Sequence, residues 1–235
     1  MTSRTLRLLG CVATLALSAS GSHAQTPQAR PLTVVELFTS QGCSSCPPAN
    51  ANLETLSHRP DVLALSFGVT YWDDLGWKDT FAKPQYTERQ WSYAKALHHS
   101  QVWTPQVVIN GRTDVVGTRL AEVDRAAEKA PLSPGPVIQI ADGLVSVGAT
   151  RGTLKSVDVW LVRYDPRVVQ VPVKRGENTG KTLPHRNVVR ELTRLGPFTG
   201  TAQSYRLPPD TTPGLAIAVL IQAGPGGPIL AAAKS

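Results

Sequence analysis

Two cysteines separated by two residues, Cys43 and Cys46, constrain this chain more than any other feature. They follow an apolar, β-branched stretch, 32–39, that predicts a strand, and they precede a helical pattern that begins near residue 46. Pro47 and Pro48 fit the first turn of that helix, where backbone N–H groups lack partners within the helix. A Cys-x-x-Cys pair at the junction of a strand and a helix is typical of sites for thiol–disulfide chemistry.

The first segment, 1–24, has the pattern of a secretory signal peptide. Arg4 and Arg7 precede a short apolar segment, 8–19, and small residues occupy the positions before an expected cleavage after Ala24. The sequence therefore predicts an exported protein, periplasmic or secreted. The apolar segment is too short to span a bilayer comfortably, so we expect no stable membrane insertion.

Export would change the cysteine inventory. The mature chain would begin with a polar linker, 25–31, and Cys11 would be lost with the leader, which leaves Cys43 and Cys46 as the cysteines. In an oxidising compartment such a pair forms a disulfide unless something reduces it. A disulfide that closes so short a loop stabilises little, which favours redox use. The alternatives are a passive disulfide and a metal pair, but a metal site needs more ligands, so we expect neither a metal nor a bound cofactor.

Charge gives weaker information about partners. The formal net charge is +7, and the positive residues are spread along the chain without a long basic run. We therefore expect no nucleic-acid partner. A local basic cluster within 174–194 is interpreted as a solvated face.

The N-terminal half, 32–134, has a regular alternation of patterns. They predict a strand, a helix, a strand, a helix, a two-stranded hairpin and a helix, at 32–39, 46–59, 61–69, 84–99, 106–109 with 113–116, and 118–130. Segment 70–83 is expected to be a long loop or a short irregular helix. Because two strands joined by a helix imply a right-handed parallel crossover, this half is predicted to be an α/β domain with a helical insertion.

The C-terminal half, 135–235, changes character. Short apolar runs separated by Gly- and Pro-rich turns predict strands at 137–140, 144–147, 157–163, 168–173, 215–222 and 229–233. One helix is predicted over 187–195, because Val188, Leu192 and Leu195 have helical spacing and Gly196 follows as a stop signal. The sequence thus predicts a β-rich C-terminal extension with one helix, and it leaves open whether this extension folds alone.

Four stretches of the chain resemble one family when they are taken together. They read VVELFTSQGCSSCPPAN, YWDDLGWKD, TPQVVINGR and RGENTGKTLPHRNVVR, and they resemble the secreted bacterial thioredoxin-like family catalogued as domain of unknown function 1223. The resemblance implies a thioredoxin-like fold with a β-rich C-terminal extension. It implies little about activity, so the function has to be argued from the site.

The two cysteines have different predicted roles. Cys43 is the candidate nucleophile, because the N–H groups and the dipole at a helix N-terminus favour its thiolate. Cys46 is the candidate resolving thiol. We expect an exported thiol–disulfide oxidoreductase that acts on thiols and disulfides of proteins or peptides and is recycled by a redox partner. The alternative is a non-catalytic periplasmic binding module, for peptide or copper, on a thioredoxin-like scaffold.

Further site residues are expected around the pair. In thioredoxin-like proteins a cis-proline faces the cysteines, and Thr104 and Pro105 match that place as substrate-binding residues; the alternative is an ordinary trans-proline. Trp72 and Trp77 follow a buried strand and are predicted to line a substrate groove, or else to pack on the core. Glu36 is a possible proton relay or part of a structural ion pair.

A polar loop precedes the predicted helix of the C-terminal half. In one interpretation its side chains serve in capping and loop hydrogen bonds, and in the other they border the redox site as a group. The residues are Arg175, Glu177, Asn178, His185, Arg186 and Asn187.

Overall fold

The computed structural model describes residues 32–152, 154–210 and 212–235, so the expected signal peptide and linker lie outside the described residues. Every element predicted for the N-terminal half is present, within a few residues at its ends. The elements are β1 (Thr33–Thr39), α1 (Pro47–Ser57), β2 (Val62–Gly68), the 3-10 helix η1 (Asp73–Leu75), α2 (Pro84–Ala96), β3 (Gln106–Ile109), β4 (Thr113–Val115) and α3 (Leu120–Lys129).

Every helix or strand among the described residues of the C-terminal half is a strand, and all six predicted strands are present, five of them with shifted ends. The strands are β5 (Ile138–Ala141), β6 (Leu144–Val147), β7 (Val157–Asp165), β8 (Val169–Pro172), β9 (Thr182–His185), β10 (Val188–Pro197), β11 (Gln203–Arg206), β12 (Ala216–Ala223) and β13 (Ile229–Lys234). The prediction of a helix over 187–195 is wrong, because these residues form β10. Strands β9 and β11 were not predicted.

The error over β10 has an identifiable cause. Strand β10 pairs with β7 through two irregularities, one between Val189 and Glu191 and one between Arg194 and Gly196. Each extra residue at a bulge shifts the side chains that follow to the opposite face, so the alternation with period two is lost. The remaining spacing of apolar residues then resembles that of a helix.

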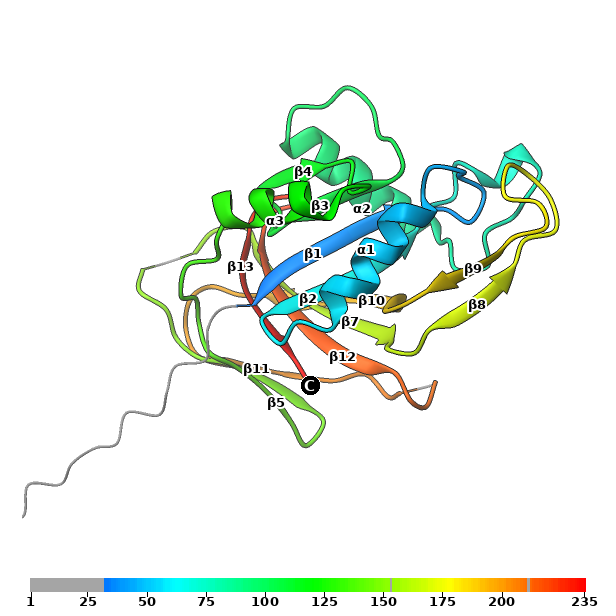
Figure 1. The fold of residues 1–235 in the computed structure, drawn as a ribbon. Coiled ribbons are helices and arrows are strands. Elements are labelled where there is room, and N and C mark those ends of the chain that lie inside the picture. Colours follow the sequence, from blue (N-terminus) through cyan, green and yellow to red (C-terminus); the bar gives the residue numbers. More distant parts are fainter. Residues whose placement is uncertain (1–31, 153, 211) are drawn as a thin grey trace, which may run out of the picture.

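Eight strands form one mixed sheet in the order β13-β12-β7-β10-β2-β1-β3-β4 (Figure 1). Strand β1 is parallel to β2 and antiparallel to β3, while β10 is parallel to β2 and antiparallel to β7. Strand β10 thus joins the strands of the two halves into a continuous sheet, so the C-terminal extension completes the N-terminal sheet. Two smaller sheets, β11-β6-β5 and β8-β9, lie outside it.

The core also crosses the boundary between the halves. On one face of the sheet Phe38 and Phe67 from the N-terminal half pack with Tyr93 of α2 and with Val162 and Leu220 from the C-terminal half. The opposite face of β1 packs against α1 and α3. The three-stranded sheet covers β7, β12 and β13 through a separate apolar cluster. Burial of apolar area on both faces therefore stabilises the two halves together.

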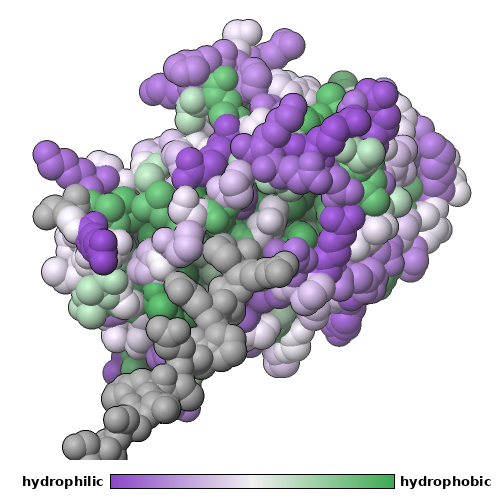
Figure 2. Space-filling model, turned by 60° about the vertical axis from the view of Figure 1, so that its left-hand side comes forward, coloured by the Kyte–Doolittle hydropathy of each residue, from purple (hydrophilic) through white to green (hydrophobic). Residues whose placement is uncertain are grey.

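On the outside, polar side chains surround patches of apolar ones on the face in Figure 2. None of the helices in the described part of the chain is long and apolar enough to cross a membrane.

Candidate functional site

The two cysteines lie where the sequence places them. Strand β1 ends at Thr39 and α1 begins at Pro47, so Cys43 lies in the connecting loop and Cys46 is the residue at the N-terminal cap of the helix. Both are free thiols, and neither has any solvent-exposed surface. We refer to residues 40–46 as the motif loop.

Cys43 has surroundings that favour its thiolate. Its Sγ lies 3.2 Å from the Ser45 hydroxyl, which can donate to a thiolate, and the neutral thiol donates to the carbonyl oxygen of Thr104 at 3.7 Å. The largest influence on the pKa of Cys43 is a hydrogen bond from the Cys46 thiol, which lowers it. Burial raises the pKa, but hydrogen bonds from the Ser45 hydroxyl and N–H lower it again, and the result is a pKa of about 6. Cys43 is therefore mostly ionised at neutral pH, as a nucleophile must be.

Cys46 has the opposite electrostatic bias. Burial raises its pKa strongly, and the adjacent Cys43 raises it further through the hydrogen bond and its charge, whereas the Thr39 hydroxyl lowers it. Asn50 Oδ1 of α1 competes for the single proton of that hydroxyl, because it accepts from Thr39 Oγ1 at 3.0 Å. The two thiols therefore differ in acidity: the Cys43 thiol ionises readily, whereas the Cys46 thiol resists ionisation.

The Thr104–Pro105 peptide bond is cis, and its carbonyl faces Cys43. Pro105 is buried and leads directly into β3, the neighbour of β1 in the sheet. Strand pairing between β1 and β3 thereby brings residues from two distant parts of the sequence to one site. The structure thus places Thr104 and Pro105 beside the cysteines.

The segment after β2 also reaches the motif loop. A β-carbon added at Gly42 would lie 3.5 Å from the Trp72 β-carbon, so this tryptophan packs against the loop backbone. Trp77 Nε1 donates to Gln41 Oε1 at 2.9 Å, and the N–H of Gln41 donates to Asp79 Oδ2 at 2.7 Å. Trp72 and Trp77 therefore border the loop. Gln41 and Asp79, which the sequence did not single out, connect it to this segment.

A third segment comes from the C-terminal half. Glu177 and Asn178, at the tip of the β8–β9 hairpin, contact the motif loop. The Ser44 N–H donates to Glu177 Oε2 at 2.9 Å, and Asn178 Nδ2 donates to the carbonyl oxygens of Gln41 at 3.0 Å and Cys43 at 2.9 Å. The hairpin tip, the motif loop and the segment around η1 meet at one end of the molecule (Figure 1). Of the polar loop residues, these two border the cysteines.

Glu36 lies in a buried ion pair instead. Arg89 Nε lies 2.7 Å from Glu36 Oε1, and both side chains are almost fully buried between β1 and α2. The Tyr93 hydroxyl donates to the same carboxylate, and Arg89 Nη1 donates to Gln222 Oε1 of β12 at 3.0 Å. These contacts connect the N-terminal half to β12, and they favour the structural ion pair over a proton relay.

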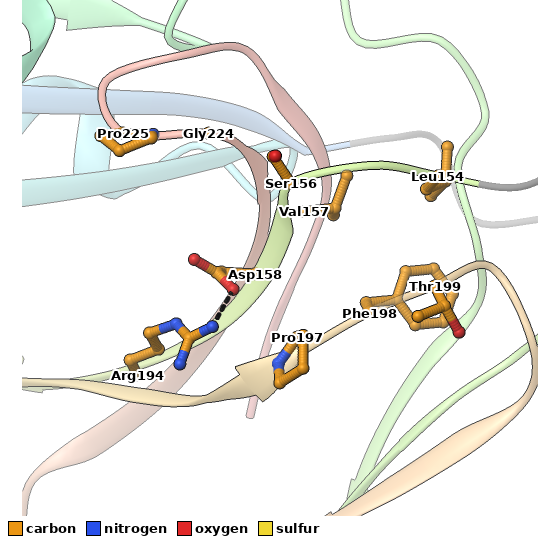
Figure 3. Close-up of a pocket in the computed structure, with 10 residues that line it drawn as sticks. All are labelled: Leu154, Ser156, Val157, Asp158, Arg194, Pro197, Phe198, Thr199, Gly224 and Pro225. Atoms are coloured by element: carbon orange, nitrogen blue, oxygen red, sulfur yellow. Dashed lines mark hydrogen bonds and ion pairs between the residues drawn. The ribbon is translucent and has the colours of Figure 1, made fainter.

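A pocket elsewhere in the molecule offers little chemistry. It lies at the ends of β7 and β10 and beside the turn at Gly224 and Pro225, with a volume of about 280 Å³ (Figure 3). Its charged side chains, Asp158 and Arg194, neutralise each other across 2.7 Å. No group of three or more potential metal-ligating side chains occurs in the described residues.

The fold and the site define a mixed α/β protein with a buried, electrostatically asymmetric pair of thiols between a strand and a helix. The chain belongs to the family described as protein of unknown function (DUF1223), whose model matches residues 34–222. No curated protein matches it.

Two solved structures are similar to this chain. The crystal structure of protein AGR_C_4864 from Agrobacterium tumefaciens is 32% identical, with a TM-score of 0.72, and the match covers 88% of this chain and 95% of that one. HBP35 of Porphyromonas gingivalis is 12% identical, with a TM-score of 0.58 and coverage of 88% and 75%. At that identity the second likeness concerns the fold alone.

Proposed function

We propose that this protein is an exported, thioredoxin-like thiol–disulfide oxidoreductase in which Cys43 is the nucleophile and Cys46 the resolving thiol. The fold assignment rests on the order β2-β1-β3-β4, on α1 after β1, and on the cis-proline before β3. In this assignment β10 takes the place of the missing first strand beside β2, and the segment from η1 to α2 contains the helical insertion.

The observation that carries the chemistry is the position of two free thiols between β1 and α1, with Cys43 Sγ 3.2 Å from the Ser45 hydroxyl. In this position the pKa values of the two thiols shift in opposite directions. Cys43 thiolate attacks one sulfur of a substrate disulfide, a Cys43–substrate bond forms, and the other substrate sulfur leaves as a thiolate. Loss of the negative charge on Cys43 then removes one cause of the raised pKa of Cys46. Cys46 loses its proton to the departing substrate thiolate and attacks Cys43 Sγ.

That second attack completes the reduction of the substrate. A Cys43–Cys46 disulfide forms and the remaining substrate sulfur is released, so the substrate gains the two electrons that the protein loses. The reverse sequence oxidises a substrate dithiol. A redox partner of the same dithiol or disulfide chemistry returns the pair to its starting state, and no bound cofactor takes part.

A neighbouring group supports a polypeptide substrate. Trp72 Nε1 is buried without a hydrogen-bond partner among the described residues. A bound peptide satisfies such a group, since an unpaired buried polar atom is costly. We assign Thr104, Pro105, Trp72 and Trp77 to the wall that binds the substrate. The proposed site of action is the periplasm or the extracellular space.

Redox titration and trapping test the proposal together. Equilibration of the mature protein in glutathione buffers should give a Cys43–Cys46 potential above roughly −300 mV, the upper end for structural disulfides. The Cys46→Ala variant should accumulate mixed disulfides through Cys43 in export-competent cells, and the matched Cys43→Ala variant should accumulate none. A reduction potential well below roughly −300 mV, together with no trapped partner, would refute the enzyme assignment.

The second candidate is a binding module, and the two free, adjacent thiols favour copper as its ligand. Soft thiolate ligands select Cu(I). Stoichiometric copper retention by the reduced protein, lost in Cys43→Ser, combined with no thiol exchange on peptides, would select this function.

A further inference from the structure

The hairpin tip, residues 174–181, bonds to the backbone of the motif loop rather than to its side chains. Glu177 accepts from the Ser44 N–H, and Asn178 donates to the carbonyl oxygens of Gln41 and Cys43. The loop atoms concerned are one backbone donor and two backbone acceptors on either side of the nucleophile. An extended polypeptide offers the same complementary groups, a carbonyl oxygen and N–H donors.

The tip is a preformed unit. Gly176 and Gly180 have φ angles of 78° and 80°, a backbone conformation that glycine adopts without steric cost. Between them, the Thr179 N–H donates to the Gly176 carbonyl at 3.1 Å, and Lys181 Nζ donates to Asn178 Oδ1 at 3.0 Å. The amide of Asn178 is thereby oriented with its nitrogen toward the motif loop.

The attachment of the tip differs from that of the other two segments at the site. Pro105 continues into β3 of the eight-stranded sheet, and Asp79, which is buried, anchors the segment after β2. The tip instead ends the two-stranded sheet β8-β9, which lies outside the large sheet (Figure 1). The tip packs through Gly176 against Trp77 of the segment after β2, but of the three segments it alone can move without disturbing the eight-stranded sheet or the buried Asp79.

Burial of the nucleophile requires some such movement. Cys43 has no exposed surface, yet a substrate sulfur must reach its Sγ in the proposed reaction. Asn178 is fully buried against the loop, whereas Glu177 and Ser44 beside it are exposed, so the contact lies at the edge of the site.

We propose that the hairpin tip is an intramolecular latch that holds the motif loop closed and that a polypeptide substrate displaces. In the free protein Glu177 and Asn178 form hydrogen bonds with backbone groups of the motif loop. The backbone of a bound substrate forms hydrogen bonds with the same groups in their place. The proposal rests on the proposed function for the identity of the displacing ligand. The latch itself is a property of the contacts between the tip and the motif loop.

Alkylation of reduced protein by iodoacetamide measures how often Cys43 becomes accessible, with the site of modification read by mass spectrometry. Loss of one hydrogen bond corresponds to a change of about 2- to 10-fold in an equilibrium. Glu177→Ala, at an exposed position, should therefore accelerate alkylation of Cys43 by about 2- to 10-fold, and Asn178→Ala, which removes both side-chain bonds to the motif loop, by about 5- to 100-fold. Gln170→Ala, at an exposed position on β8 of the same hairpin but outside the tip, is the matched control and should leave the rate unchanged.

Two corrections keep the result interpretable. Rates are divided by the thiolate fraction from a pH titration of each variant, so that an altered pKa of Cys43 is not read as opening. Circular dichroism and the alkylation rate in denaturant identify a variant that has lost its fold. Corrected rates equal to wild type in both folded variants, Glu177→Ala and Asn178→Ala, overturn the latch.

Failure of the latch and failure of the proposed function give different results. Suppose that Cys43 is alkylated faster in Glu177→Ala and Asn178→Ala, but that neither wild type nor any variant exchanges with peptide disulfides. This result supports the latch and refutes the oxidoreductase. Unchanged alkylation with normal exchange overturns the latch and leaves the enzyme assignment standing. Where both hold, Asn178→Ala should lower KM for a peptide disulfide, because the substrate no longer competes with the tip.

Discussion

Replacement of Cys46 by alanine should make Cys43 a weaker acid. The hydrogen bond from the Cys46 thiol is the largest influence that lowers the pKa of Cys43 to about 6. A hydrogen bond to a charged group contributes roughly 1.5–3 kcal/mol, and one pKa unit corresponds to about 1.4 kcal/mol. We therefore expect Cys46→Ala to raise the pKa of Cys43 by about 1–2 units, to about 7–8.

Ultraviolet absorbance of the thiolate during a pH titration of the reduced protein measures this shift. Wild type should show one thiolate that forms near pH 6, because the pKa of Cys46 is raised far above that of Cys43. Tyrosine ionisation should not overlap this transition, since burial raises the pKa of Tyr71 and Tyr86. At pH 7 the ionised fraction should fall from about 90% in wild type to about half or less in the variant.

Two further variants make the assignment secure. Ser45→Ala should raise the pKa of Cys43 by less than Cys46→Ala does, because the Ser45 hydroxyl is a smaller influence than the Cys46 thiol. Cys43→Ala should abolish the transition near pH 6. An unchanged midpoint in Cys46→Ala, with the transition still lost in Cys43→Ala, would refute the role of Cys46 as hydrogen-bond donor.

Three other predictions concern stability. Burial and the charge of Arg190 lower the pKa of His185 from 6.5 to about 4. Below pH 6.5 His185 therefore binds a proton in the unfolded chain but not in the native protein. The free energy of unfolding should fall by up to about 3 kcal/mol as the pH drops from 6.5 to 4. His185→Leu should remove this loss in urea unfolding; identical pH dependence in wild type and variant would contradict it. Arg89→Met leaves Glu36 buried without its cation and should lower the free energy of unfolding by about 3–5 kcal/mol. The double variant Arg89→Met with Glu36→Leu should lose less, and a larger loss in the double variant would count against the ion pair. Leu192→Ala should cost about 2–5 kcal/mol by calorimetry, and a negligible loss would argue against a core position in β10.

Much of the site could be predicted because its determinants are local. The β-branched run before Cys43 and the prolines after Cys46 specify a strand, a loop and a helix through backbone preferences of adjacent residues. The turn at Asn110 and Gly111, both with positive φ, likewise identifies the β3–β4 hairpin. Such signals depend little on the rest of the chain.

The position of β10 could not be predicted because its cause is not local. Val188 lies opposite Ser66 of β2, and the rest of the strand pairs with β7 across two bulges. A bulge is set by the partner strand, and it removes the alternation from which a strand is recognised. Apolar residues at helical spacing therefore adopted a strand in the middle of the sheet.

The amino-acid sequence by itself determined that two thiols lie between a strand and a helix. The tertiary structure decided what surrounds them. Asn178 reaches the carbonyl of Cys43 from 135 residues away, and Arg89 rather than a cysteine faces Glu36. Side-chain partners of this kind depend on strand order and on which elements pack together, and these follow from burying the whole apolar surface at once.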